Sequence, residues 1–198
     1  LYAGAGLTSA WIPQEGLAAL NCRVPEVMAV LRGPGSTHHV HWERYDALAL
    51  GPGLGNTGES LKLLEEVFTH FKKPVVIDAD GINVIASNYE IMGMVPEDSI
   101  FTPHVKEFDR LFGVHENWWD RIQTGIENAT HLGCTIVLKN QYTMIFTPEG
   151  KCHFNPTGTP AMATGGAGDV LAGVIASFLA QGYSPVNAAI LGVYVHGK

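Results

Sequence analysis

The sequence lacks any run of apolar residues long enough to cross a bilayer, and it lacks the charged-then-apolar leader of secreted chains. We therefore expect a soluble, cytoplasmic protein without a membrane partner. Basic residues are scarce, because 12 lysines and arginines stand against 19 aspartates and glutamates, a formal net charge of −7. A nucleic-acid partner would need a basic face, so none is expected, whereas local loops can still bind an anionic small molecule.

Cysteine is also sparse. The three cysteines, Cys22, Cys134 and Cys152, have no CxxC spacing, and Cys134 has apolar neighbours. This odd and scattered set favours free thiols in a reducing cytoplasm over a zinc site or a redox pair. Internal repeats, low-complexity tracts and linkers are absent as well, so residues 1–198 are expected to form a single domain.

Short apolar runs alternate with longer stretches of helical spacing, which is the pattern of βα units around a largely parallel sheet. The expected strands span residues 7–12, 27–31, 47–51, 75–78, 99–102 and 135–139, and a hairpin pair spans residues 143–147 and 151–155. The expected helices span residues 57–71, 116–132 and 170–182, and another begins at residues 184–185. The predicted fold class is therefore α/β.

A glycine-rich segment, Thr164-Gly165-Gly166-Ala167-Gly168-Asp169, precedes the most regular of these helices. Its glycines let the backbone approach a ligand closely, and the helix start adds unpaired N–H groups and a positive dipole end. Together they predict an anion hole for a phosphate in transfer, with Asp169 as the base that accepts a hydroxyl proton. The alternative is that Asp169 only caps the helix and the glycines only form a tight turn.

Three further polar or glycine-rich segments follow expected strands, where open α/β sheets hold ligands. Residues 51–55, Gly-Pro-Gly-Leu-Gly, form either a binding loop or an ordinary turn. Asp78 and Asp80 would bind Mg²⁺ through water or tie down neighbouring loops, and the structural role is favoured. His104 in residues 102–107 would point to the same sheet edge, although a lone histidine is more often structural.

Lys139 ends another expected strand, and on its own such a lysine is most often a solvated side chain. The histidines of residues 37–41 look like a metal cluster, but no carboxylate or cysteine has supporting spacing, so no metal site is predicted there. Trp118 and Trp119 are interpreted as packing or oligomer contacts.

Taken in order, these segments resemble the ADP/ATP-dependent NAD(P)H-hydrate dehydratases, a carbohydrate-kinase-like family that repairs hydrated nicotinamide cofactors. The matching segments are residues 3–7, 51–55, 78–83, 102–104, 155–158, 165–173 and 191–197. Each segment alone is weak evidence, but the combination is specific and covers nearly the whole chain.

The resemblance implies a ribokinase-like three-layer α/β/α sandwich with a mostly parallel central sheet. It implies conversion of the S epimer of NADHX or NADPHX back to NADH or NADPH, with Mg²⁺, with ADP as the favoured phosphoryl donor over ATP, and with release of AMP and phosphate. A homo-oligomer is also expected. Carried onto this chain, the catalytic base is Asp169. The implied hydrate-binding residues are Gly53, Gly55, His104 and Asp169. The implied nucleotide-binding residues are Lys139, Asn140, Gln141, Tyr142, Thr143, Gly166, Ala167 and Gly168.

The chain departs from the family pattern in three places. Val105-Lys106-Glu107-Phe108 stands where the family has Pro-Gly-Glu-Met, and residues 139–143 are bulkier than the usual Lys-Gly-Ala-Gly-Thr. The family's first strand and last helix are expected to be missing. Two alternatives stay open, a small-molecule kinase acting on a vitamin precursor and a nucleotide-binding module without turnover.

Overall fold

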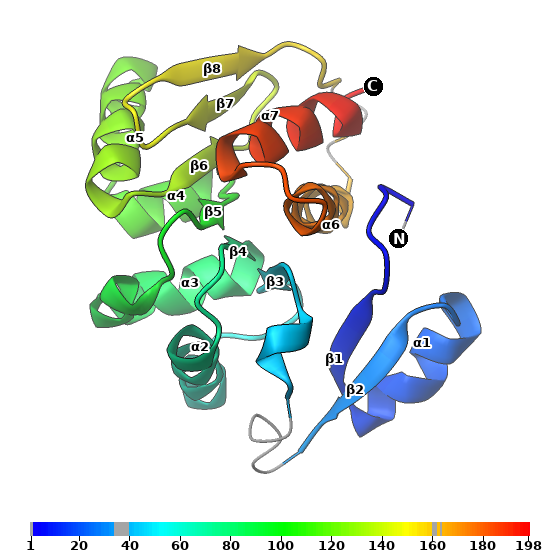
Figure 1. The fold of residues 1–198 in the computed structure, drawn as a ribbon. Coiled ribbons are helices and arrows are strands. Elements are labelled where there is room, and N and C mark those ends of the chain that lie inside the picture. Colours follow the sequence, from blue (N-terminus) through cyan, green and yellow to red (C-terminus); the bar gives the residue numbers. More distant parts are fainter. Residues whose placement is uncertain (1, 34–39, 160–161, 163) are drawn as a thin grey trace.

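A computed structural model describes residues 2–33, 40–159, 162 and 164–198 (Figure 1). Strands β1 (Ser9–Pro13) and β2 (Met28–Arg32) pair in parallel, with helix α1 (Leu17–Arg23) between them in the chain. A six-stranded sheet follows, in the order β3-β4-β5-β6-β7-β8. Its strands are β3 (Leu48–Leu50), β4 (Val75–Ile77), β5 (Ile100–Phe101), β6 (Thr135–Leu138), β7 (Thr143–Phe146) and β8 (Cys152–Asn155).

The first four strands of this sheet are parallel, and β7 and β8 form the antiparallel hairpin at its end. Two layers of helices cover its faces (Figure 1). One layer contains α2 (Gly58–His70), α3 (Ala79–Ser87), α4 (Val105–Phe112) and α5 (Trp118–Leu132). The other contains α6 (Ala167–Ala180) and α7 (Pro185–His196). Short 3₁₀ turns span Gln14–Gly16, Trp42–Arg44 and Tyr89–Met94.

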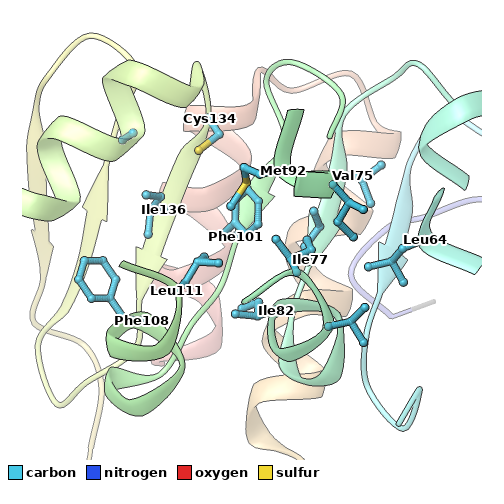
Figure 2. Close-up of a cluster of buried hydrophobic side chains, with 14 of the residues drawn as sticks. Leu64, Val75, Ile77, Ile82, Met92, Phe101, Phe108, Leu111, Cys134 and Ile136 are labelled. Carbon is cyan, nitrogen blue, oxygen red and sulfur yellow. The ribbon is translucent and has the colours of Figure 1, made fainter. Parts of the chain in front are cut away.

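The alternation of side chains along the strands builds two separate cores. Val75 and Ile77 of β4 belong to the cluster under α2 to α5, which Figure 2 shows, whereas Val76 belongs to the cluster under α6 and α7. Successive strand residues point to opposite faces, so strands covered on both sides must be apolar throughout. This arrangement confirms the predicted three-layer α/β/α class with a mostly parallel central sheet.

The predicted strands are all present, with ends that differ by one or two residues. The predicted helix stop at Gly133 is confirmed by its left-handed backbone, with φ at 59°, and the Ser184 side chain caps α7 as expected. The prediction of polar loops after β4 and β5 was wrong, because helices begin there at Ala79 and Val105. Both helices are short, but α4 does have a helical stripe of apolar residues that sequence reasoning missed, namely Val105, Phe108, Leu111 and Phe112.

Among the helices in the described ranges, none is long and apolar enough to cross a membrane. Buried Cys134 and the other two cysteines are free thiols, as predicted. Trp118 is 43% exposed and lies against the guanidinium of Arg121, whereas Trp119 is 68% exposed. Neither tryptophan is a core residue of this chain.

Candidate active site

A cavity of about 630 Å³ opens at the carboxyl ends of the central strands. This is the edge where parallel α/β sheets hold ligands, and the volume is typical of small-molecule sites. The cavity brings together most of the residues that the sequence singled out. Those that line it are His104, Lys139, Asn140, Gln141, Thr143, Ala167, Gly168 and Asp169. Tyr142 is 56% exposed, and neither it nor Gly166 belongs to the lining.

The N-terminus of α6 forms one wall of this cavity. Gly166 is the N-cap residue, with a left-handed φ of 89°, and it makes no side-chain cap. The first N–H to bond back to it is that of Val170, 3.1 Å from the Gly166 carbonyl oxygen. Helix geometry leaves the N–H groups of the preceding turn without intrahelical partners. With the positive end of the helix dipole they make this wall attractive to an anion.

Asp169 is the third residue of α6, an exposed position on the cavity lining. The cap of this helix is Gly166, so the alternative in which Asp169 merely caps the helix does not hold. A carboxylate in this position on the cavity lining is placed to act as a proton acceptor.

Asp78 and Lys139 form an ion pair that sequence reasoning missed. Asp78, at the end of β4, is 1% exposed, and its Oδ1 accepts a hydrogen bond of 2.6 Å from Nζ of Lys139, at the end of β6. The ammonium lies against α6, because a Cβ added at Gly168 would be 3.1 Å from that Nζ. Lys139 is therefore not the solvated side chain that its position alone suggests. The two residues are 61 positions apart, so only the folded sheet reveals the pair.

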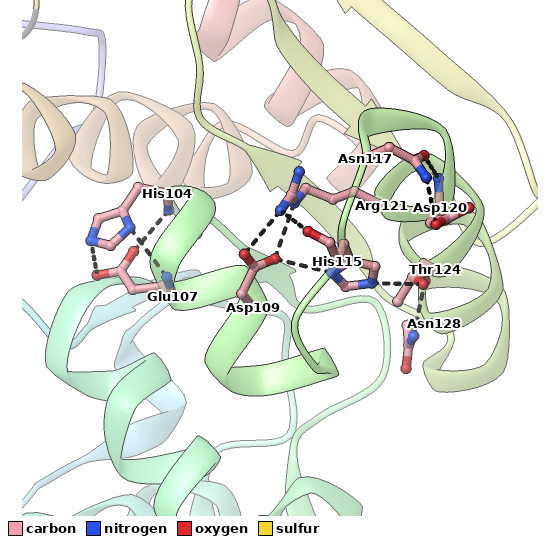
Figure 3. Close-up of polar contacts among 9 residues, drawn as sticks. All are labelled: His104, Glu107, Asp109, His115, Asn117, Asp120, Arg121, Thr124 and Asn128. Carbon is pink, nitrogen blue, oxygen red and sulfur yellow. Dashed lines mark hydrogen bonds and ion pairs between the residues drawn. The ribbon is translucent and has the colours of Figure 1, made fainter.

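His104 caps α4 and is joined to Glu107, as Figure 3 shows. Its Nδ1 accepts from the Glu107 N–H at 3.2 Å, while Oε2 of Glu107 accepts from the His104 N–H at 2.8 Å. The Nε2 atom then carries the hydrogen and lies 3.3 Å from Oε1 of Glu107. The imidazole is thus fixed in one orientation at the cavity, and about half of it stays open to solvent.

His196, near the end of α7, also lines the cavity, although sequence reasoning assigned it no role. Burial lowers its pKa, and the positive charge of Lys139 lowers the pKa further, against an opposing contribution from the Ala167 backbone. The ring is therefore neutral near neutral pH. His196 thus places a hydrogen-bonding side chain on the part of the cavity wall that α7 forms.

The glycine-rich turn after β3 lies elsewhere. Gly53 lines a second cavity, of about 660 Å³, which is bounded by β1, β3 and α6. Gly55 donates its N–H to Oδ2 of Asp80 at 2.8 Å, so this carboxylate ties the turn to the start of α3. Gly51 has a φ of 127°, and a Cβ there would lie 1.7 Å from the Asp78 carbonyl oxygen. The structure does not bring these glycines into the cavity that contains Asp169.

Behind the site, a partly buried polar network joins α4 to α5 (Figure 3). Arg121 donates from Nε and Nη2 to the two oxygens of Asp109, at 3.0 and 2.9 Å, and His115 contacts the same carboxylate at 3.0 Å. Burial tends to raise the pKa of Asp109, but the hydrogen bonds from Arg121 and His115 outweigh it and hold the pKa below its usual value. The network fixes the two helices relative to each other.

Within the described part of the chain, no three His, Cys, Asp or Glu side chains are grouped so as to hold a metal ion. His38 and His39 lie outside the described residues, and His41 pairs with Glu43 at 3.2 Å. The carboxylates that line the candidate site are those of Asp78, Glu107 and Asp169, and Glu107 is engaged with His104.

The fold and this cavity define a ribokinase-like α/β protein with a ligand-sized cavity at the start of α6. The family model described as NAD(P)H-hydrate dehydratase matches residues 1–198. The chain belongs to that family. Its sequence is similar to the ADP-dependent (S)-NAD(P)H-hydrate dehydratase of Lactiplantibacillus plantarum, at 34% identity over 98% of this chain and 69% of the relative.

Longer relatives and a solved structure agree with this assignment. The bifunctional NAD(P)H-hydrate repair enzyme of Moorella thermoacetica is 34% identical over 100% of this chain, which spans only 39% of that enzyme's length. The ADP/ATP-dependent NAD(P)H-hydrate dehydratase of Bacillus subtilis, co-crystallised with ATP and Mg²⁺, superposes with a TM-score of 0.83. It is 29% identical, and the match covers 99% of this chain and 70% of that one.

Proposed function

We propose that this chain catalyses the ADP-dependent dehydration of hydrated nicotinamide cofactors. The S epimer of NADHX or NADPHX is converted back to NADH or NADPH, and AMP and phosphate are released. The observation that carries the proposal is the position of Asp169 on the cavity lining, at the uncapped start of α6. The relative from Lactiplantibacillus plantarum, named for this reaction with ADP, supports the choice of donor.

In the first step, the carboxylate of Asp169 accepts the proton of the hydrate hydroxyl. The hydroxyl oxygen forms a bond to the terminal phosphorus of ADP, and AMP leaves with the electrons of the broken P–O bond. The free N–H groups of α6, with the ammonium of Lys139 beside them, face the negative charge that builds up on the phosphoryl oxygens. These charges are fixed before the reaction and need no rearrangement during it.

In the second step, the C–O bond of the phosphorylated ring breaks and phosphate leaves with its electron pair. The neighbouring ring carbon gives a proton to the departing phosphate, and the double bond of the dihydronicotinamide forms. The oxygen of the lost water thus leaves within phosphate. The hydrate is held by Asp169 and His104 in this proposal, and the cap that fixes the His104 ring favours a defined contact.

The nucleotide lies along the end of β6 and the start of α6. Ala167 and Gly168 cradle its transferred phosphate together with Gly166, and Lys139 contacts the phosphates. The base and ribose lie against residues 140–143, of which Asn140, Gln141 and Thr143 line the cavity and Tyr142 stands exposed beside it.

Mg²⁺ fits this site as an ion that arrives with the nucleotide. It is usually held by one or two carboxylates together with substrate phosphates, and the site offers the carboxylates of Asp78 and Asp169. When bound, the ion neutralises phosphate charge. Asp169 and Asp78 would hold it through its water shell.

We place the chain in the cytoplasm as a homo-oligomer. Free thiols at all three cysteines suit a reducing compartment. Light scattering of the purified protein measures the oligomeric state.

The test is to replace Asp169 with Asn and to follow NADHX with ADP, reading both returning NADH absorbance and phosphate release. We expect a loss of about 10²- to 10⁴-fold in turnover with ADP binding retained, since acid–base groups contribute that much. Asp120 is the matched control, because it is also the third residue of an exposed helix start, in α5. Asp120→Asn should leave turnover unchanged.

A loss of less than about tenfold at Asp169→Asn contradicts the acid–base role. Accumulation of a stable phosphorylated product without phosphate release points instead to a small-molecule kinase. ADP binding without turnover points to a binding module.

A further inference from the structure

The Asp78 carboxylate is a buried charge that neither the helix it precedes nor solvent satisfies. Asp78 is the N-cap residue of α3, where an aspartate normally accepts a hydrogen bond from the first turn, yet its side chain makes no cap. Ala79, the next residue, has a left-handed φ of 47°. Such a backbone is strained for a residue other than glycine and persists where the surroundings demand it.

The carboxylate faces the cavity instead. Oδ1 accepts from Nζ of Lys139 at 2.6 Å, and within the described residues Oδ2 is buried without a hydrogen-bond partner. A Cβ added at Gly168 would lie 3.1 Å from the ammonium and 3.6 Å from Oδ2. A carboxylate that is 1% exposed, an ammonium and the start of α6 thus meet around one glycine.

This meeting point has an electrostatic consequence. An ammonium and the positive end of a helix dipole repel each other, so while no anion is bound Lys139 needs another counter-charge to stay beside Gly168. Asp78 supplies that counter-charge from a fixed position in β4. It also offsets part of the positive charge that an incoming phosphate would meet.

We propose that Asp78 is the positioning residue for Lys139, holding its ammonium at the α6 anion hole at the expense of ground-state anion affinity. The assignment rests on the proposed function in one respect only, which is that the bound anion is the phosphate of a nucleotide. The proposal predicts that the loss of Asp78 and the loss of Lys139 change the affinity for an anion in opposite directions. Loss of Asp78 tightens anion binding while turnover falls, whereas loss of Lys139 weakens anion binding.

The experiment measures the dissociation constant of inorganic pyrophosphate by calorimetry in Mg²⁺-free buffer, for wild type, Asp78→Asn, Lys139→Met and the double variant. We expect Asp78→Asn to bind about threefold to tenfold more tightly, the size of one screened charge several ångströms from the anion. We expect Lys139→Met to bind at least about tenfold more weakly. In the Lys139→Met background, Asp78→Asn should have a smaller effect on affinity than in the wild type, because the ammonium that Asp78 holds is then absent.

A gain of less than about twofold at Asp78→Asn, or an equal effect with and without Lys139, overturns the assignment. Asp78→Glu keeps the charge but displaces it, so it should lower turnover without tightening pyrophosphate binding. If Asp78→Asn does not fold, Asp78→Glu still tests the proposal, because tighter pyrophosphate binding by Asp78→Glu would contradict it.

Pyrophosphate binding does not require hydrate turnover. A wild-type chain that binds pyrophosphate and never returns NADH therefore refutes the dehydratase function alone.

Discussion

The contact between α6 and α7 positions both Asp169 and His196, and Gly192→Ala tests it directly. Gly192 is buried on α7, and a Cβ there would lie 2.5 Å from Cγ1 of Ile175 on α6 and 3.3 Å from its Cα. Ile175 is 0% exposed and β-branched, so its side chain has little freedom to move aside. The two helices must therefore separate to admit a methyl group.

The magnitude follows from two opposing effects. Alanine in place of a helical glycine stabilises by about 1 kcal/mol, whereas overpacking of a dense interior costs about 1–3 kcal/mol. Because the backbone of Ile175 is also within reach, we take the upper part of that range, which leaves a net loss of about 2 kcal/mol. Gly173 on α6 is the matched control, since a Cβ there meets nothing within 4 Å. Gly173→Ala should gain about 1 kcal/mol.

Urea unfolding followed by circular dichroism measures the free energy of unfolding of both variants. The dependence of this free energy on urea concentration should be the same for the two. The two substitutions are chemically identical, yet their unfolding free energies should differ by about 3 kcal/mol. Equal stabilities would refute the packing argument. Turnover should also fall in Gly192→Ala but not in Gly173→Ala, because only the former shifts the end of α7 that carries His196 to the cavity.

Two further predictions concern α4. Arg121→Met leaves the carboxylate of Asp109 partly buried without its main partner, so unfolding free energy at about pH 7 should fall by about 3 kcal/mol. The stability that comes from the lowered pKa of Asp109 is present above its usual value and lost as pH falls through the lowered one. The acid limb of a urea-stability profile should therefore flatten in this variant. His104→Asn keeps a cap acceptor, so stability should change by less than about 1 kcal/mol while the KM for hydrate rises. An unchanged KM restricts His104 to capping.

The strands were predictable because each is covered on both faces. A segment such as Val75–Ile77 must be apolar at every position, and that continuous run is visible without knowledge of its neighbours. Helix α6 was predictable for the same kind of reason, since its buried positions recur on one stripe. Helices α3 and α4 were missed because polar residues at their starts have local alternatives, as turns or as ligand loops.

The residues of the candidate site likewise fall into those that a local pattern predicts and those that only the fold reveals. Residues 164–169 predict an anion hole from the sequence alone, because the prediction depends only on the local backbone of a glycine-rich segment. His196 has no such signal, because its place at the cavity depends on how α7 crosses the sheet. The separation of Gly53 and Gly55 from Asp169 depends likewise on where β3 lies, at the edge of the six-stranded sheet.

Asp78 makes an interaction that the residues next to it in the sequence do not reveal. An aspartate between a strand and a helix is most simply a helix cap, and Ala79 gives no hint of a left-handed turn, since alanine normally avoids that conformation. The chain accepts this strained turn, and the carboxylate it frees becomes the partner of Lys139 across the sheet. Strain at one residue and an unsatisfied oxygen at the next are both unfavourable for folding alone. Their coincidence in the cavity next to Gly168 of α6 therefore supports the proposed anion site.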